Sequence, residues 1–191
     1  FDIPVDNLYA SPIFALDTRH HFADMSKITV ISPDVGGVAR ARELAERIDA
    51  ELAIVDKRRP APGEVSQMTI IGEVKNRVCI IVDDICDTAG TLVKAVDLLL
   101  GEGAVEVHAY VTHGVLSGKA VERINNSKIK SLVVTDSIEA TENVKKSSKI
   151  RSVATAPMLA QAMLNIALGT SVSSLFDDET LGPIYEAFYP E

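Results

Sequence analysis

Asp83, Asp84 and the segment Asp87–Thr91 carry the residue types in this chain that are best suited to chemistry. The apolar run Val78–Val82 comes directly before them and has the β-branched composition of a parallel strand buried on both faces. Open α/β sheets bind ligands beyond the carboxyl ends of such strands. Two adjacent carboxylates can accept hydrogen bonds from two sugar hydroxyls, and a small-residue loop that opens a helix can surround a phosphate with N–H groups. The string therefore predicts a ribose 5-phosphate site.

Each residue of this string also has an ordinary structural interpretation. An aspartate at a strand end is common, and Asp or Thr before a helix is often only an N-cap. The order of the whole string favours a ligand site, with Asp83 and its companion Asp84 on the ribose 2- and 3-hydroxyls. The residues expected around the 5-phosphate are Asp87, Thr88, Ala89, Gly90 and Thr91. Asp87 is unexpected beside an anion, and its carboxylate either caps the loop's own amides or faces the sugar.

A second polar segment, Ser32–Arg42, follows the apolar run Ile28–Ile31. Asp34 in this segment is either a turn carboxylate or a ligand-binding group. The glycines that follow Asp34 favour the second interpretation, because glycine lets backbone approach a ligand closely. We expect Arg40 and Arg42 to be surface cations of the helix that follows.

A cluster of cations, Lys57, Arg58 and Arg59, follows the predicted strand 52–55 and opens a segment with two prolines and a glycine. On its own such a cluster is a basic surface turn, and we expect residues 57–66 to form an exposed, mobile loop. Transfer of a phosphoryl group needs positive charge held against the moving phosphates. A loop bearing Lys57 and Arg59 can bring that charge and exclude water. Arg58 would point the other way in an extended segment.

Strand-like runs alternate with helical patterns along the chain, which predicts an α/β fold with a parallel sheet flanked by helices. The expected strands are 28–32, 52–55, 78–82, 105–111 and 131–135. The expected helices are 38–48, 92–100, 117–125 and 158–168, the last of them stopped by Gly169. The polar stretch 139–149 is expected to be a solvated helix or loop.

Composition narrows the class of protein. A chain of 191 residues with 47% hydrophobic residues fits one domain with a real core. The net charge of −8 argues against nucleic acid as a partner, and no apolar run reaches the roughly 18 residues of a membrane span. Two cysteines without a disulfide pattern favour a cytoplasmic protein. Anionic ligands would then need local cations and a Mg²⁺ ion. His20 and His21 are expected in a solvated connection.

The string Val82–Thr91, VDDICDTAGT, resembles the phosphoribosyl pyrophosphate (PRPP) binding loop of type I phosphoribosyltransferases and of PRPP synthetases. Further segments, in their order and spacing, make the chain similar to the ribose-phosphate pyrophosphokinase family from Phe1 to Phe176. These segments are Phe1–Leu8, Ser32–Arg42, Val55–Pro60, Thr112–Gly118, Glu122–Ser127 and Ser171–Phe176.

The resemblance implies a type I phosphoribosyltransferase-like fold and transfer of pyrophosphate from ATP to ribose 5-phosphate, giving PRPP and AMP. It implies that Lys57 and Arg59 are catalytic, that Arg59 also contacts the sugar phosphate, and that Asp34 helps to bind Mg²⁺. The family commonly forms homo-oligomers, so a homohexamer is expected. Ser171 and Ser173 belong either to a regulatory phosphate site between subunits or to a polar turn.

The same resemblance implies a division of the chain. Residues 1–15 would be the junction from an amino-terminal domain that is not in this sequence, 16–170 the phosphoribosyltransferase-like domain, and 171–191 a tail. The chain alone would be inactive, although it can still bind ribose 5-phosphate. Two alternatives are a salvage phosphoribosyltransferase and a non-catalytic PRPP-binding regulatory partner. The first lacks an evident base-binding hood, and the second should have lost loop residues that are present here.

Overall fold

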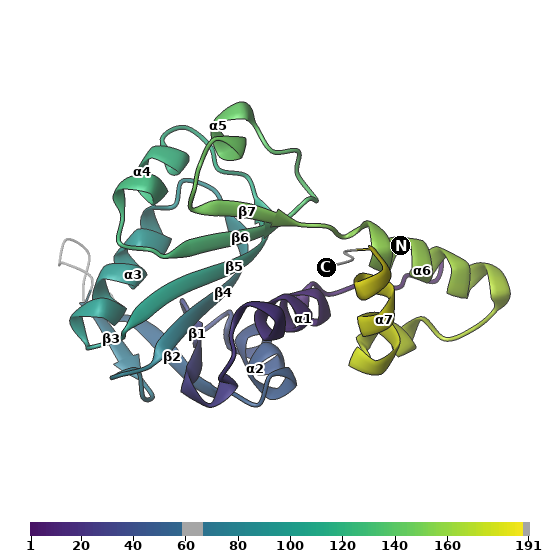
Figure 1. Ribbon diagram of the computed structural model, residues 1–191, viewed down its shortest axis with the longest axis horizontal. Helices are drawn as coiled ribbons and strands as arrows, with labels where there is room; N and C mark the ends of the chain where they lie inside the picture. The colour runs from purple at the N-terminus through teal and green to yellow at the C-terminus, as the bar shows by residue number, and fades with distance from the viewer. Residues whose placement is uncertain (59–66, 189–191) are drawn as a thin grey trace.

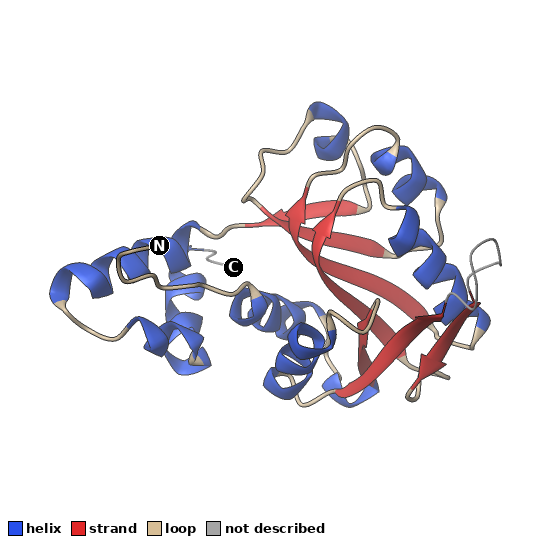
Figure 2. Cartoon of the chain, turned by 180° about the vertical axis from the view of Figure 1, so that it is seen from behind, coloured by secondary structure: helices blue, strands red, loops and turns tan. Residues whose placement is uncertain are grey.

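The computed structural model describes residues 1–58 and 67–188, and this part of the chain forms a seven-stranded sheet with helices on both faces (Figure 1, Figure 2). The strands are β1 Ile28–Ser32, β2 Glu51–Arg58, β3 Gln67–Ile71, β4 Val78–Cys86, β5 Glu106–Gly114, β6 Ser131–Thr135 and β7 Ile150–Val153. The α-helices are α1 Ser11–His21, α2 Val38–Arg47, α3 Gly90–Gly101, α4 Ala120–Asn126, α5 Glu142–Lys145, α6 Ala156–Leu168 and α7 Asp178–Phe188. Two short 3₁₀ helices are η1 Met25–Lys27 and η2 Val172–Phe176.

The order of the strands in the sheet is β3-β2-β1-β4-β5-β6-β7. All neighbouring pairs are parallel except β2 and β3. From β1 the chain moves through α2 to β2 on one side, whereas from β4 it moves through α3 to β5 on the other side. The boundary between β1 and β4 is therefore a topological switch point, which is where open α/β sheets bind ligands.

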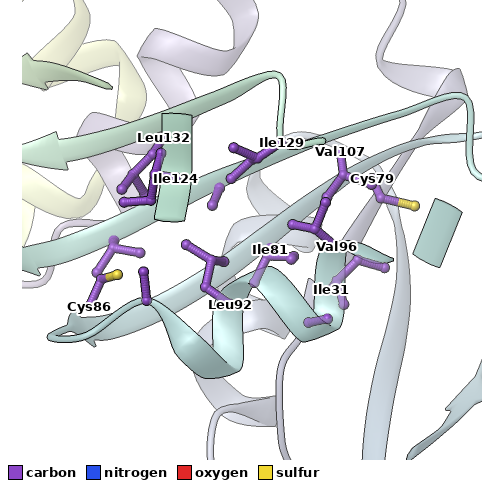
Figure 3. Close-up of a cluster of buried hydrophobic side chains, with 14 of the residues drawn as sticks. Ile31, Cys79, Ile81, Cys86, Leu92, Val96, Val107, Ile124, Ile129 and Leu132 are labelled. Atoms are coloured by element: carbon purple, nitrogen blue, oxygen red, sulfur yellow. The ribbon is translucent and has the colours of Figure 1, made fainter. Parts of the chain in front are cut away.

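Two hydrophobic cores cover the two faces of the sheet, because successive side chains of a strand point to opposite faces. Ile31 of β1 and Ile81 of β4 pack with the inner sides of α3 and α4 (Figure 3). Their neighbours Val30 and Ile80 pack in the other core, with residues of α1, α2 and α6. Both faces of the central strands are thus buried, as the uninterrupted apolar runs predict.

Helix α1 is fixed to β5 and β7 by a partly buried polar cluster. The Asp17 carboxylate accepts hydrogen bonds from the Tyr110 hydroxyl of β5 at 2.6 Å and from the Arg151 guanidinium of β7, with Nη1 at 2.7 Å. Tyr110 is 1% exposed, and burial, together with the Asp17 charge, raises the pKa of its hydroxyl. Two partly buried charges next to the core are tolerated here because they are paired and hydrogen-bonded.

The five expected strands and the four expected helices are present, so the predicted fold class is confirmed, although α1 and α7 were not predicted. The sequence did not predict β3 and β7, and it ended β4 four residues too early, at Val82. His20 and His21 are exposed but lie in the last turn of α1, so the expectation of a connection is wrong. Among the described residues, no helix is long and apolar enough to cross a membrane.

Two expected boundaries fall inside observed elements. Residues 11–15, assigned above to a junction, form the start of α1 and bury Ile13, Phe14 and Ala15 in the core. Lys57 and Arg58 belong to β2, where Lys57 pairs with Met68 of β3, so the expected loop does not begin at Lys57. The remainder of that loop, 59–66, lies outside the described residues.

Gly72 gives a test of how closely the edge of the sheet is packed. A Cβ atom at this position would lie 2.7 Å from the Cβ of Ala53, and the backbone φ of Gly72 is +118°. We expect Gly72→Ala to lower the free energy of unfolding by about 2 kcal/mol or more, because overpacking and an unfavourable φ act together. Urea denaturation measures this change.

Gly101→Ala is the matched control, because nothing lies within 4 Å of a Cβ at this helical position. It should raise the free energy of unfolding by up to about 1 kcal/mol, as alanine is the better helix former. Equal unfolding midpoints for the two variants would show that the packing at Gly72 is not a constraint.

Candidate functional site

The switch point places the two polar segments of the sequence side by side. Asp34 follows β1, and the paired residues Ile31 and Ile81 align β1 with β4 so that Asp83 and Asp84 lie at the same edge of the sheet. Arg40, in the first turn of α2, joins the two segments. Its Nη2 lies 2.8 Å from Oδ2 of Asp84, and its Nη1 lies 3.4 Å from Oδ1 of Asp83.

Asp83 and Asp84 occupy different environments although they are adjacent in β4. The Asp83 side chain is partly buried, and this burial raises its pKa to about 6, with the charge of Asp84 acting in the same direction. Asp84 is more exposed. Its small burial acts to raise its pKa, but the hydrogen bond with Asp83 and the charge of Arg40 outweigh this effect and hold the pKa below its usual value. The pair therefore has one firmly ionised carboxylate and one that titrates near neutral pH.

The loop after β4 turns sharply into α3. Ala89 has a left-handed backbone with φ of +60°, which is uncommon for a residue with a side chain. Helix α3 starts at Gly90, and the first helical hydrogen bond runs from the Val93 N–H to the Ala89 carbonyl at 3.0 Å. The N–H groups of Gly90, Thr91 and Leu92 precede that bond and have no partner in the preceding turn of helix. The start of α3 therefore has the donors and the dipole of an anion site.

The loop is held from one side by the segment that follows β5. The Ser117 hydroxyl donates to Oδ1 of Asp87, and the Ser117 N–H donates to the Asp87 carbonyl at 3.0 Å. The Arg123 guanidinium of α4 donates to the Thr88 carbonyl at 2.7 Å. The sequence left open whether Asp87 caps its own loop or faces the sugar. The structure shows a third arrangement, in which this carboxylate is turned toward Ser117.

Asp34 acts as a turn carboxylate, which is one of the two interpretations that the sequence allowed. Its Oδ1 accepts a hydrogen bond from the Gly37 N–H at 2.8 Å, just before α2 begins. A Cβ on Gly37 would lie 2.9 Å from the Ser32 hydroxyl and 3.4 Å from Nη1 of Arg40, so this turn needs a glycine. Asp34 itself is exposed and lies at the edge of the sheet that also carries Asp83.

The acidic residues of the described part of the chain do not form a protein cage for a metal. No group of three or more His, Cys, Asp or Glu side chains that could hold an ion occurs among them. A single exposed carboxylate such as Asp34 still fits Mg²⁺, because this ion commonly uses one or two carboxylates together with substrate phosphates and water. It does not fit a structural zinc site.

The remaining polar residues of interest lie at other places in the fold, and two of them are described only in part or not at all. The backbone of Lys57 lies in β2, next to β1 in the sheet, and Arg59 lies outside the described residues. Ser171 and Ser173 are exposed at the start of η2, and the Ser171 carbonyl accepts from Asn165 Nδ2 at 2.8 Å. His113, at the end of β5, lies 2.8 Å from the Ser137 hydroxyl.

Sequence reasoning missed the residues that organise the site. Arg40 was expected on the helix surface, whereas it pairs with both aspartates. Ser117 and Arg123 lie in two of the segments that carry the family resemblance, 112–118 and 122–127, but neither was given a role. Two features together could have identified the role of Arg40. It lies in the first turn of the helix after the Gly36-Gly37 pair, and the strand order puts β1 beside β4.

Known proteins resemble this chain along almost its whole length. The family described as "Phosphoribosyl synthetase-associated domain" matches residues 56–177. A ribose-phosphate pyrophosphokinase of Cereibacter sphaeroides is 65% identical over 99% of this chain and 56% of its own length. Another, of Bradyrhizobium diazoefficiens, is 57% identical over 93% of this chain and 56% of its own length. The chain thus spans little more than half the length of these curated relatives.

The three-dimensional structure has a matching relative as well. The crystal structure of phosphoribosylpyrophosphate synthetase from Mycobacterium smegmatis superposes with a TM-score of 0.80 at 33% identity. The match covers 88% of this chain and 54% of that one. The resemblance noted in the sequence is therefore confirmed in both sequence and fold. Since the family match extends over more than half of the chain, the chain belongs to the phosphoribosyl synthetase-associated domain family.

Proposed function

We propose that this chain carries the ribose 5-phosphate site and part of the catalytic machinery of a ribose-phosphate pyrophosphokinase. That enzyme would transfer pyrophosphate from ATP to the anomeric hydroxyl of ribose 5-phosphate and give PRPP and AMP, for nucleotide biosynthesis in the cytoplasm. The observation that carries the proposal is the position of Asp83 and Asp84 directly before the anion site at the start of α3. The relatives named ribose-phosphate pyrophosphokinase support it.

The site has separate parts for the two ends of the substrate. Asp83 and Asp84 accept hydrogen bonds from the ribose 2- and 3-hydroxyls, and the loop of Asp87, Thr88, Ala89, Gly90 and Thr91 surrounds the 5-phosphate. The backbone N–H groups of the loop bind the anion without the help of a charged, flexible side chain. Arg40 keeps the two carboxylates in place while it balances their charge.

The reaction requires little covalent chemistry from the protein. The anomeric oxygen attacks the β-phosphorus of ATP, the bond from that phosphorus to the α,β-bridging oxygen breaks, AMP leaves, and the hydroxyl proton is lost. Lys57 and Arg59 supply positive charge to the transferring group, and Arg59 also contacts the sugar phosphate. Asp34, phosphate oxygens and water would hold Mg²⁺, which neutralises phosphate charge.

Two further expectations belong to the same proposal. The protein self-associates, as a homohexamer, and Ser171 and Ser173 contribute to a regulatory phosphate site. Residues 1–15, 16–170 and 171–191 keep their proposed division into junction, phosphoribosyltransferase-like domain and tail. The described structure supports close packing of the tail, because Tyr185 of α7 donates to the Ala154 carbonyl at 2.7 Å.

Ligand binding by this chain can test the sugar-binding part and the phosphate-binding part of the site separately. We expect the chain to bind ribose 5-phosphate more tightly than inorganic phosphate, as measured by titration calorimetry. Asp84→Asn should weaken ribose 5-phosphate by about tenfold, because a hydrogen bond to a charged acceptor is lost. It should leave inorganic phosphate unchanged or slightly tighter. Asp97→Asn, at an exposed aspartate of α3, is the control. Equal affinities for the two ligands would exclude the sugar-binding role.

The pH dependence of binding tests Asp83 separately. Its pKa, raised to about 6, means that the carboxylate gains its charge as the pH rises from about 5 to 7. The ionised form is the better acceptor, so the advantage of the wild-type chain over Asp83→Asn should grow across this range. The comparison is made as a ratio because the substrate phosphate also titrates near pH 6. A ratio that stays flat would remove Asp83 from the site.

Catalysis is tested in the full-length polypeptide that carries this sequence. AMP release from ATP and Mg²⁺ should depend on ribose 5-phosphate, with no nucleobase present. Lys57→Ala should lower kcat by about 100-fold, the usual effect of removing one group that stabilises transition-state charge. Lys94→Ala, an exposed lysine of α3, should leave kcat unchanged. No AMP release together with measurable PRPP binding would favour the regulatory or salvage alternatives.

A further inference from the structure

Three successive carbonyl groups, one at the end of β4 and two in the loop after it, are held by one segment. The Cys86 carbonyl accepts from the Leu116 N–H at 3.0 Å, and the Asp87 carbonyl accepts from the Ser117 N–H at the same distance. The Thr88 carbonyl accepts from Arg123 at 2.7 Å. Three successive peptide groups are thus oriented by residues 116–123, a segment that we call the brace.

The orientation of these carbonyls decides where the loop's N–H groups point. In a trans peptide the C=O and N–H bonds of one plane point in opposite directions. When the brace holds the carbonyls of Cys86 and Asp87, the N–H groups of Asp87 and Thr88 must point away from it. The Ala89 N–H belongs to the peptide fixed by Arg123 and is directed to the buried Cys86 thiol. The brace therefore turns the N–H groups of Asp87 and Thr88 to the opposite side of the loop, whereas the N–H group of Ala89 is used by the thiol.

The brace is shaped and anchored for this task. Leu116 has a left-handed backbone with φ of +51° and is 8% exposed, so a residue under backbone strain is fixed in the core next to the loop. Ala120 and Ile124 bury the inner side of α4 completely. Ser117 and Arg123 are themselves exposed, so their hydrogen bonds are not needed to fill the core.

Ser117 also fixes the position of the negative charge in the loop. Its hydroxyl donates to the Asp87 carboxylate, which keeps that negative group turned toward the brace. Without this bond the carboxylate is free to rotate toward the phosphate and repel it. The two contacts thus have one effect, which is to leave amides on the ligand side of the loop and the carboxylate on the other.

We propose that Ser117 and Arg123 are positioning residues for the phosphate-binding loop, acting on the substrate through the carbonyls and the carboxylate of residues 87 and 88. The inference rests on the proposed ribose 5-phosphate site. Arg123 fixes the Thr88 peptide, and Ser117 withdraws the Asp87 charge. Neither residue needs to touch the substrate.

The test measures binding of inorganic phosphate and of ribose 5-phosphate to the 191-residue chain by titration calorimetry. Arg123→Met should weaken both ligands by the same factor, about tenfold, because the phosphate end is affected and a charge-assisted hydrogen bond is lost. Arg123→Lys should recover most of the affinity. Lys119→Met is the matched control, because it removes the same charge from the same segment. It should change both affinities much less.

Ser117→Ala separates positioning from charge, because it changes no charge. It should weaken both ligands by about threefold, and adding Asp87→Asn should restore the loss, as two residues that act through one contact are not additive. The amide NMR shift of Ala89, whose N–H belongs to the peptide that Arg123 holds, should move in the ligand-free Arg123→Met chain and stay in place in Lys119→Met.

The outcomes distinguish the two proposals. If the wild-type chain binds neither ligand, the phosphate site fails and the brace fails with it. If the wild type binds both and the Arg123 and Ser117 variants bind as well as it does, the brace is overturned and the site stands. Equal losses in Arg123→Met and Lys119→Met would reduce Arg123 to a distant charge and would also overturn the inference.

Discussion

The parallel pairing of β1 with β4 is the constraint on which the rest of the site depends. Their register, with Ile31 opposite Ile81, brings two loops together that are about 50 residues apart in the sequence. Because the chain leaves β1 and β4 in opposite directions, α2 and α3 cover opposite faces and leave a space between their starting points. Arg40 spans this boundary from one helix to the carboxylates of the neighbouring strand. If the two strands were not adjacent, Asp34, Arg40 and the aspartate pair would be unrelated surface residues.

The electrostatics of the site are local, since the chain as a whole has a net charge of −8. Opposite charges are matched over a few ångströms where Arg40 meets the two aspartates, and the start of α3 presents N–H groups and the positive end of the helix dipole. Fixed N–H groups have an advantage over lysines in this setting. They need no long side chain to be ordered. A chain with a net negative charge can therefore still present a local arrangement of donors that suits an anion.

Much of the fold could be predicted from the sequence, because its apolar residues form continuous runs in buried strands and recur at helical spacing in helices. The run Val78–Val82 and the helix of residues 92–100 are examples. Strand β7 was not predicted, because it has four residues and two of them, Arg151 and Ser152, are polar. In the site, the aspartates and the small-residue loop stand out by residue type. The pairing of Arg40 with the aspartates depends on strand order. The hydrogen bonds of the brace are made to main-chain carbonyls, which every residue has. Neither kind of contact leaves a pattern in a single sequence.

The cluster of Asp17, Tyr110 and Arg151 has a consequence for the order in which the protein can assemble. Asp17 and Arg151 are 134 positions apart, so during synthesis α1 leaves the ribosome long before its partner strand exists. Its apolar residues Ile13 and Phe14 have no completed core to enter until then. Contacts over such separations are formed late, after the entropy of closing the intervening chain has been overcome. Helix α1 can pack on α2 soon after both have been made, but the polar contact that fixes it to β7 forms only late, although α1 comes early in the sequence.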